Sequence, residues 1–248
     1  MHDVALFVTC LTDQYYPQVG LAITRILEHF GCRVHFPQAQ TCCGQPLYNN
    51  GFHTEAADLA RRMIEIFEPY PCIVTPSASC CAMVREHFPR LLAGQPAWQT
   101  GLRKLVGNTF EFVEFLDKVL KVDFGTLELP KPLTLTCHYN CHLRALGIGQ
   151  DQTLRLLRGM RNVEFRPMDD AEQCCGFGGS FSVKYPAISA VIAEEKAQSI
   201  AATEAAVAVC NDAGCAMNIS GMLHRQKNPA QVRHIAEIVA ESLGLLKG

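Results

Sequence analysis

The chain carries 13 cysteines among its 248 residues, and eight of them recur in an arrangement that could hold metal. Two adjacent cysteines followed by glycine occur twice, at Cys42-Cys43-Gly44 and at Cys174-Cys175-Gly176. One further cysteine precedes each pair, with 31 and 32 residues between, and another follows it after 36 and 39 residues. These flanking cysteines are Cys10 and Cys80 in the first half, and Cys141 and Cys215 in the second. The repeated order and spacing indicate an internal duplication with two thiolate-rich sites.

Thiolate sulfur is a soft, negatively charged ligand that suits iron–sulfur clusters, Zn²⁺ and Cu⁺. Adjacent cysteines are hard to place on one tetrahedral ion, because successive side chains diverge along an extended backbone. They more naturally reach different metal atoms of one cluster, and a following glycine permits a tight turn against a bulky inorganic core. A structural zinc site is the alternative, but its ligands usually come in pairs only about two to four residues apart. The eight repeated cysteines are not spaced in that way, which favours clusters.

The start of the chain gives the expected compartment. Met1–Cys10 has no basic stretch and only a short apolar run, which predicts a strand and not a secretory signal. We therefore expect a cytoplasmic protein, in which disulfides rarely persist and clustered thiols bind metal or do redox chemistry. Cys32 and Cys72 stand in apolar runs and are expected to be ordinary core residues.

The composition excludes several classes of partner. Hydrophobic residues make up 48% of the chain, enough for a substantial core, and the formal net charge is −2. With no basic run, the sequence gives no electrostatic case for binding nucleic acid or an anionic membrane. Because no window approaches the ~18 consecutive apolar residues of a membrane helix, we expect no direct membrane insertion.

The elements that must position the cysteines alternate along the chain. Short apolar runs predict strands at 4–9, 32–36, 72–75, 133–136, 163–166 and 205–209. Helical periodicity predicts helices at 20–30, 54–67, 102–120, 153–157, 188–202 and 231–243, with a further helix starting at 82–87. Such alternation is typical of βαβ units and a parallel sheet. Pro130 and Pro132 mark the expected junction between a first domain, 1–129, and a second, 130–248.

The predicted fold is therefore α/β, with two similar lobes from an internal duplication, each a small and mostly parallel sheet flanked by helices. Val74 and Val209, in predicted strands, each lie six residues before the last cysteine of their half. Both last cysteines should thus fall just beyond the carboxyl end of a strand, the edge at which open α/β sheets bind ligands.

The pattern Cys…Cys-Cys-Gly…Cys, present twice, resembles the cysteine-rich CCG domain family, whose members include a component of heterodisulfide reductase and the iron–sulfur subunit of glycolate oxidase. Within it, the sequence is most similar to a lactate-utilisation branch of small proteins with two such domains and little else. The resemblance spans essentially the whole chain. The segments that carry it are Thr41-Cys42-Cys43-Gly44-Gln45-Pro46, Pro76-Ser77-Ala78-Ser79-Cys80, 141–148 and Cys174-Cys175-Gly176-Phe177-Gly178-Gly179.

The resemblance implies two iron–sulfur clusters of the [4Fe-4S] type, cubane or non-cubane. The implied ligands are Cys10, Cys42, Cys43 and Cys80 for one, and Cys141, Cys174, Cys175 and Cys215 for the other. Where heterodisulfide reductase has a full C-x-x-C, this chain has Ser77 and Asp212 at the earlier position. Either each cluster has four thiolate ligands, or Cys81 and Cys210 supply extra ones, or one site is degenerate. Cys137, four residues before Cys141, is a further candidate.

Several neighbouring residues have weaker claims. His138 and His142 flank Cys141, where an imidazole could hydrogen-bond a cluster sulfur, or simply occupy a loop. Arg144 could hold an anionic substrate or project into solvent. Glu194-Glu195-Lys196 is predicted to be a solvated helix face.

By resemblance, the expected function is an iron–sulfur redox subunit of a multi-component system that oxidises L-lactate, an oxidoreductase whose partner subunits carry ferredoxin-like clusters. A thiol–disulfide reductase subunit of the heterodisulfide type is one alternative, and a zinc-binding interaction module is another. The chain has no G-x-G-x-x-G fingerprint, which argues against a nicotinamide or flavin dinucleotide bound by this chain.

Overall fold

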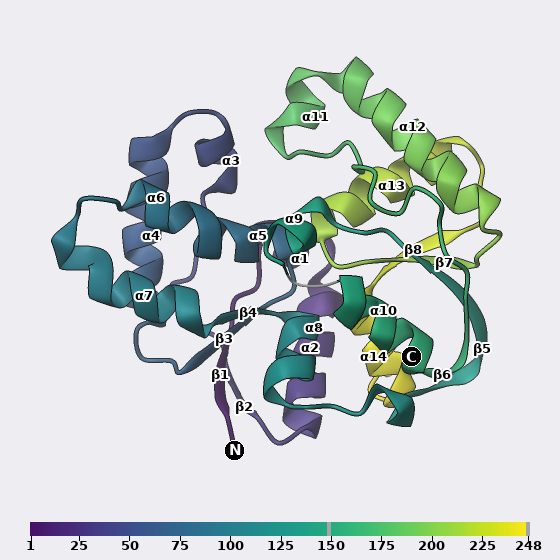
Figure 1. Ribbon diagram of the computed structural model, residues 1–248, viewed down its shortest axis with the longest axis horizontal. Coiled ribbons are helices and arrows are strands. Elements are labelled where there is room, and N and C mark those ends of the chain that lie inside the picture. Colours follow the sequence, from purple (N-terminus) through teal and green to yellow (C-terminus); the bar gives the residue numbers. More distant parts are fainter. Residues whose placement is uncertain (148–149, 247–248) are drawn as a thin grey trace. The chain divides into compact units, whose positions relative to one another are not determined.

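The computed structural model describes residues 1–147 and 150–246, so that Ile148 of the third resembling segment lies outside the described residues. The chain folds as two compact units, Met1–Leu120 and Lys121–Gly248 (Figure 1). Pro130 and Pro132 lie within the first strand of the second unit. No helix in the described part of the chain is both long and apolar enough to cross a membrane.

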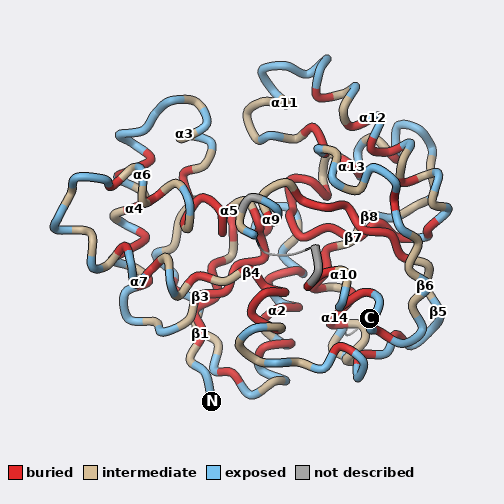
Figure 2. The backbone as a smooth tube through the Cα atoms, viewed as in Figure 1, coloured by how far each residue is buried: buried red, intermediate tan, exposed pale blue. Residues whose placement is uncertain are grey.

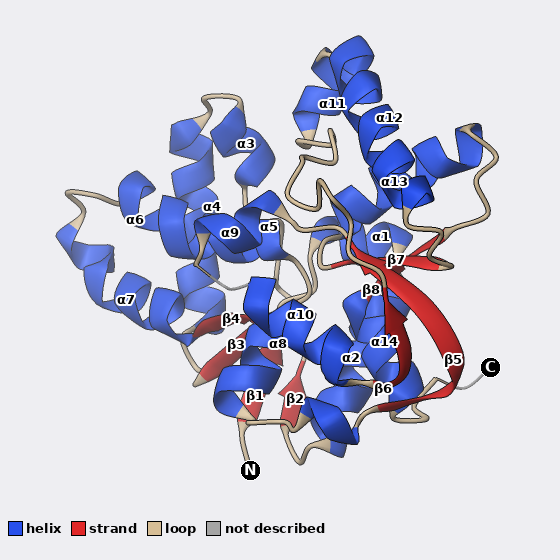
Figure 3. Cartoon of the chain, turned by 45° about the vertical axis from the view of Figure 1, so that its right-hand side comes forward, coloured by secondary structure: helices blue, strands red, loops and turns tan. Residues whose placement is uncertain are grey.

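The first unit is built on a parallel sheet with the strand order β2-β1-β3-β4 (Figure 3). Its strands are β1 (Asp3–Leu6), β2 (Arg33–His35), β3 (Cys72–Thr75) and β4 (Thr109–Glu111). Its α-helices are α1 (Cys10–Tyr15), α2 (Pro17–His29), α3 (Gln45–Asn49), α4 (His53–Phe67), α5 (Ala78–Ala82), α6 (Phe88–Leu91), α7 (Gln99–Asn108) and α8 (Phe112–Glu114). A 3-10 turn covers Pro96–Trp98, and π-helical turns cover Met83–His87 and Phe115–Val119.

The second unit repeats this plan with the strand order β6-β5-β7-β8, again all parallel. Its strands are β5 (Glu128–Cys137), β6 (Arg161–Phe165), β7 (Val207–Cys210) and β8 (Gln231–His234). Its α-helices are α9 (Cys141–Ala145), α10 (Gln150–Gly159), α11 (Ser180–Lys184), α12 (Pro186–Ala202), α13 (Ala213–Arg225) and α14 (Ile235–Ser242), preceded by a 3-10 turn at Phe124–Thr126. The matching strand orders confirm the predicted α/β fold with two similar lobes.

Each sheet is held by apolar helix faces packed on its central strands; β1, β3 and β7 are largely buried, and β5 is buried at its carboxyl end (Figure 2). In α4, Ala56, Ala60, Met63, Ile64 and Phe67 are buried at the three- and four-residue spacing of one helix face. They share a hydrophobic cluster with Phe7 and Ile73. This core fixes the sheet edge from which the cysteine-bearing loops emerge.

Two of the predicted helices are wrong in the same way. The segment Leu102–Leu120 contains strand β4 between two helical stretches, and Gln231–Leu243 begins with strand β8. Both are edge strands that run directly into a helix, so their few residues merge with its periodicity. Glu111 and His234 mark the change, since each side chain accepts a hydrogen bond from a backbone N–H in the first turn of the following helix.

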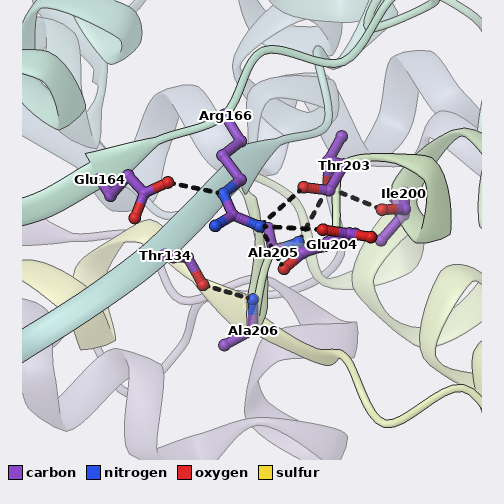
Figure 4. Close-up of polar contacts among 8 residues, drawn as sticks. All are labelled: Thr134, Glu164, Arg166, Ile200, Thr203, Glu204, Ala205 and Ala206. Carbon is purple, nitrogen blue, oxygen red and sulfur yellow. Dashed lines mark hydrogen bonds and ion pairs between the residues drawn. The ribbon is translucent and has the colours of Figure 1, made fainter.

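Hydrogen bonds and an ion pair in the second unit hold the turn between α12 and β7 in place (Figure 4). Arg166, which follows β6, pairs with Glu164 at 2.8 Å and donates to the carbonyl oxygens of Thr203 and Glu204 at 3.3 and 2.9 Å. The hydroxyl of Thr134 on β5 accepts a hydrogen bond from the N–H of Ala206 at 2.9 Å. These contacts set the start of β7, the strand that leads to α13 and its cysteine.

Candidate metal centres

The repeated cysteines of each unit stand where the chain leaves a strand at its carboxyl end. Cys10 begins α1 after β1, and Cys80 lies in α5 after β3. Cys42 and Cys43 lie in the loop between β2 and α3. The second unit places Cys141 at the start of α9, and Cys174 and Cys175 between β6 and α11. Cys215 lies in the first turn of α13. Because parallel strands end at the same edge, these loops converge there.

In the first unit, all four cysteines are linked by sulfur contacts. The Sγ atoms of Cys43 and Cys80 are 3.3 Å apart, and those of Cys10 and Cys42 are 3.9 Å apart. Cys43 and Cys80 are buried, Cys42 is half-buried and Cys10 is exposed. The site therefore has a dry side and a side that meets solvent.

Hydrogen bonding makes the thiol of Cys42 strongly acidic. The thiols of Cys10 and Cys43 donate to its sulfur, as does the N–H of Gly44 at 3.4 Å, and together they lower the pKa of Cys42 to about 3. The same contacts raise the pKa of Cys10 and Cys43, and burial adds to that rise. Cys42 is thus a thiolate at neutral pH, the form that binds metal.

The second unit repeats the arrangement more tightly. The Sγ atoms of Cys175 and Cys215 are 2.9 Å apart, and both side chains are buried. The thiols of Cys141 and Cys175 and the N–H of Gly176 donate to Cys174, which lowers the pKa of Cys174 to about 2. Asn140 adds a further donor to this site, since its side-chain N–H contacts the sulfur of Cys215 at 3.4 Å.

The glycine after each cysteine pair is required by its backbone and its surroundings. Gly44 and Gly176 have φ of 83° and 80°, in the left-handed region. A Cβ on Gly176 would lie 2.7 Å from the carbonyl oxygen of Ser189, whereas one on Gly44 would lie 3.2 Å from a methyl group of Leu59. Each glycine thereby turns its N–H toward the first sulfur of the pair.

Comparison with known proteins matches the sequence that builds these two sites to a family. The CCG cysteine-rich domain matches residues 4–85 and 135–220, two copies that include all eight repeated cysteines. The chain belongs to the CCG cysteine-rich domain family. It is 44% identical to lactate utilization protein A of Geobacillus kaustophilus over 237 residues, 95% of this chain and 98% of that protein. It is 44% identical over 247 residues to the protein of that name from an Exiguobacterium species, 98% of this chain and 99% of that protein. The Bacillus licheniformis protein is 42% identical over 237 residues.

His138 belongs to the second CCG site, although the sequence predicted only a flanking role for it. The side chain is 1% exposed, and its ring lies within 4.8 Å of the sulfur atoms of Cys175 and Cys215. Both ring nitrogens lack a hydrogen-bond partner among the described residues. Burial, and then the nearby charge of Lys196, lower the pKa of His138 to about 3, so the imidazole is neutral. A buried, neutral, unpartnered imidazole beside two thiols fits a site that binds a metal centre.

Lys196 corrects the prediction of a solvated helix face. The side chain is fully buried, and its Nζ donates to the carbonyl oxygens of Asp170 and Ala171 and to the sulfur of Met168. Three acceptors match the three N–H groups of an ammonium. Lys196 thus places a positive charge behind the second CCG site and holds the loop that leads into Cys174.

Ser77 and Asp212 act as helix caps in the two CCG domains. The hydroxyl of Ser77 accepts a hydrogen bond from the N–H of Cys80 at 3.2 Å, and the carboxylate of Asp212 accepts one from the N–H of Gly214 at 3.0 Å. Each cap orients the helical turn that carries the last cysteine. The sequence identified both positions as departures but gave no role for them.

The three candidates for extra ligands, Cys81, Cys137 and Cys210, are all buried. Cys81 is fully buried, which raises its pKa, with the charges of Arg85 and Glu114 close by. Cys210 ends β7 and Cys137 ends β5, and burial raises the pKa of both. The thiol of Cys137 donates to the carbonyl oxygen of His138 at 3.6 Å.

The remaining flanking residues of the second domain face different partners. Nδ1 of His142 is 3.6 Å from the sulfur of Cys141. Arg144 is exposed and pairs with Glu172 at 2.9 Å. His142 thus borders the cysteines, and Arg144 is engaged with a surface carboxylate.

Proposed function

We propose that this chain is an iron–sulfur redox subunit of a multi-component system that oxidises L-lactate, and that each CCG domain holds one cluster of the [4Fe-4S] type. The observation that carries the proposal is the convergence, twice, of four cysteines at one sheet edge. The proposed ligands are Cys10, Cys42, Cys43 and Cys80, and Cys141, Cys174, Cys175 and Cys215. The substrate class is taken from the relatives, which are named for lactate utilization.

A bound cluster of this kind supplies one-electron transfer. The protein's own residues would set how readily that happens. The N–H groups of Gly44 and Gly176 point at the sulfur atoms of Cys42 and Cys174, and hydrogen bonds to sulfur favour the more negative, reduced state. The buried pair of cysteines in each unit keeps water from one side of the site, while Cys10 and Cys174 reach the surface, where a partner could exchange electrons.

The chain is expected to need partners, because the cysteine sites account for electron transfer but not for the removal of a hydride from the substrate. We expect the purified chain alone to oxidise no L-lactate, and activity to appear when subunits with ferredoxin-like clusters are added. Turnover of L-lactate by the chain alone, measured with an artificial electron acceptor, would contradict this division of labour.

Iron and acid-labile sulfide analysis of anaerobically reconstituted protein tests the cluster assignment. We expect two clusters per chain, since the two donor sets are equivalent in number and placement. About one zinc per site, with no labile sulfide after reconstitution, would instead support the zinc-binding alternative, which the close group of His138, Cys175 and Cys215 favours most.

Serine substitutions separate the two sites. We expect Cys42→Ser and Cys174→Ser each to remove about half of the iron and one of two EPR signals, because each substitution removes a thiol whose pKa is lowered enough for it to be a thiolate at neutral pH. Cys32→Ser, in the first unit but outside the repeated pattern, is the control and should keep both signals. Loss of both signals from either single variant would contradict two independent clusters.

A further inference from the structure

The two CCG sites differ at the position that directly follows the first strand of each unit, which is Phe7 in the first and His138 in the second. The N–H of Phe7 donates to the carbonyl oxygen of Val74 at 2.9 Å, and the N–H of His138 donates to that of Val209, also at 2.9 Å. Phe7 and His138 each lie three residues before the first cysteine of their site. The backbone is therefore held in the same way in both units, and only the side chain differs.

In the first unit that side chain serves the core. Phe7 is fully buried, belongs to the hydrophobic cluster and packs edge-to-face on Phe67, with ring centroids 5.6 Å apart. In the second unit the position carries an imidazole that is just as buried. A histidine here has no packing advantage over phenylalanine, and its two ring nitrogens lose their hydrogen bonds to water.

The surroundings of His138 indicate what its ring serves. The ligand atoms of His138, Cys175 and Cys215 all lie within 4.8 Å of one another. Thiolate sulfur and neutral imidazole nitrogen are combined by zinc and by some iron–sulfur centres. We propose that His138 is a ligand of the metal centre in the second CCG domain, so that this site binds through nitrogen and sulfur while the first binds through sulfur alone.

This inference rests on the proposed metal-binding function of the same site, and it makes the two centres unequal. In this arrangement the imidazole takes the place of one of the four thiolates, beside Cys175 and Cys215, which removes negative charge from the cluster and raises its reduction potential. The second centre should therefore be reduced before the first. The first domain, with Phe7 in place of the histidine, serves as the internal reference.

Nitrogen-sensitive pulsed EPR of the anaerobically reduced holoprotein tests the ligand directly. We expect a strong nitrogen coupling on one of two cluster signals, which changes when histidine is labelled with ¹⁵N. His138→Phe, the residue of the first unit, and His138→Gln should both lose that coupling and lower the potential of that cluster alone. His142→Phe is the matched control, because it removes the other imidazole near Cys141 but should leave the coupling intact.

The outcomes separate this inference from the proposed function. If two clusters form but neither shows a histidine nitrogen coupling of ligand strength, or if His138→Gln keeps it, His138 is not a ligand. If no sulfide is incorporated, the cluster proposal fails, and Co²⁺ added to the apoprotein becomes the probe. We then expect His138→Gln to weaken Co²⁺ binding in the second unit roughly tenfold or more, and more than His142→Phe does, since His142 contacts a ligand sulfur without belonging to the group of His138, Cys175 and Cys215. Equal Co²⁺ affinity in His138→Gln and the unsubstituted protein would overturn the inference.

Discussion

Replacing Gly176 with alanine is expected to destabilise the second unit by about 2–5 kcal/mol and to empty its metal centre. The left-handed backbone at φ 80° costs an alanine about 1–2 kcal/mol. Its Cβ would also lie 2.7 Å from the backbone oxygen of Ser189, and a further 1–3 kcal/mol is typical of such overpacking. Because Ser189 is buried within α12, the helix must shift, and the loop with Cys174 and Cys175 moves with it.

Gly44→Ala is the matched control, since φ is nearly the same but the nearest contact is a rotatable Leu59 methyl at 3.2 Å. We expect a loss of only about 1–2 kcal/mol there, with iron largely retained. Urea unfolding of the apoproteins and iron analysis of the reconstituted variants measure both effects. A Gly44→Ala variant that loses as much stability and iron as Gly176→Ala would show that the clash with α12 is not what matters.

Met63→Lys is expected to destabilise the first unit more than Lys196→Met destabilises the second. Leu59 and Ile192 lie where a Cβ on the equivalent glycines, Gly44 and Gly176, would point, and four residues further along α4 and α12 stand Met63 and Lys196. Met63→Lys would place a charge in the hydrophobic cluster without the loop carbonyls that Lys196 has. A destabilisation of about 3–5 kcal/mol is expected, as for a buried charge without its partner.

Lys196→Met should destabilise the second unit less, by about 1–3 kcal/mol. The carbonyl oxygens of Asp170 and Ala171 lose their charged donor, but the substitution buries no unpaired charge. Its larger effect should be on the bound centre. Removing the ammonium makes the reduction potential of the second cluster more negative, by an amount on the order of tens of millivolts. Urea unfolding and an EPR-monitored redox titration check the two expectations. An unchanged potential in Lys196→Met would mean that its charge does not reach the site.

The sequence was sufficient for the plan of the fold, because buried parallel strands appear as short apolar runs and the cysteine spacing exposes the duplication. The predicted strand at 72–75 coincides with β3. The edge strands β4 and β8 could not be found in the same way, since three or four residues running into a helix carry no period of their own.

The lining of the second site was missed for a different reason. The burial of Lys196 depends on carbonyl oxygens that lie about 25 residues earlier in the chain. The pattern of the helix around Lys196 does not predict these acceptors. A signal was nevertheless present. Aligning the two halves on their first cysteines places His138 opposite Phe7, and one inserted residue after the cysteine pair brings Lys196 opposite Met63. Polar residues opposite buried apolar ones identify the positions where the two copies have diverged.

The first cysteine of each adjacent pair differs in exposure between the two units, and this difference decides which unit of the apoprotein reacts first. Cys174 is exposed and has the lower pKa of its site, whereas in the first unit the acidic Cys42 is half-buried and the exposed Cys10 stays protonated. Nucleophilic attack requires a sulfur that is both ionised and accessible. Alkylating reagents and peroxide will therefore modify the second unit first. Anaerobic handling before metal loading protects the second domain above all.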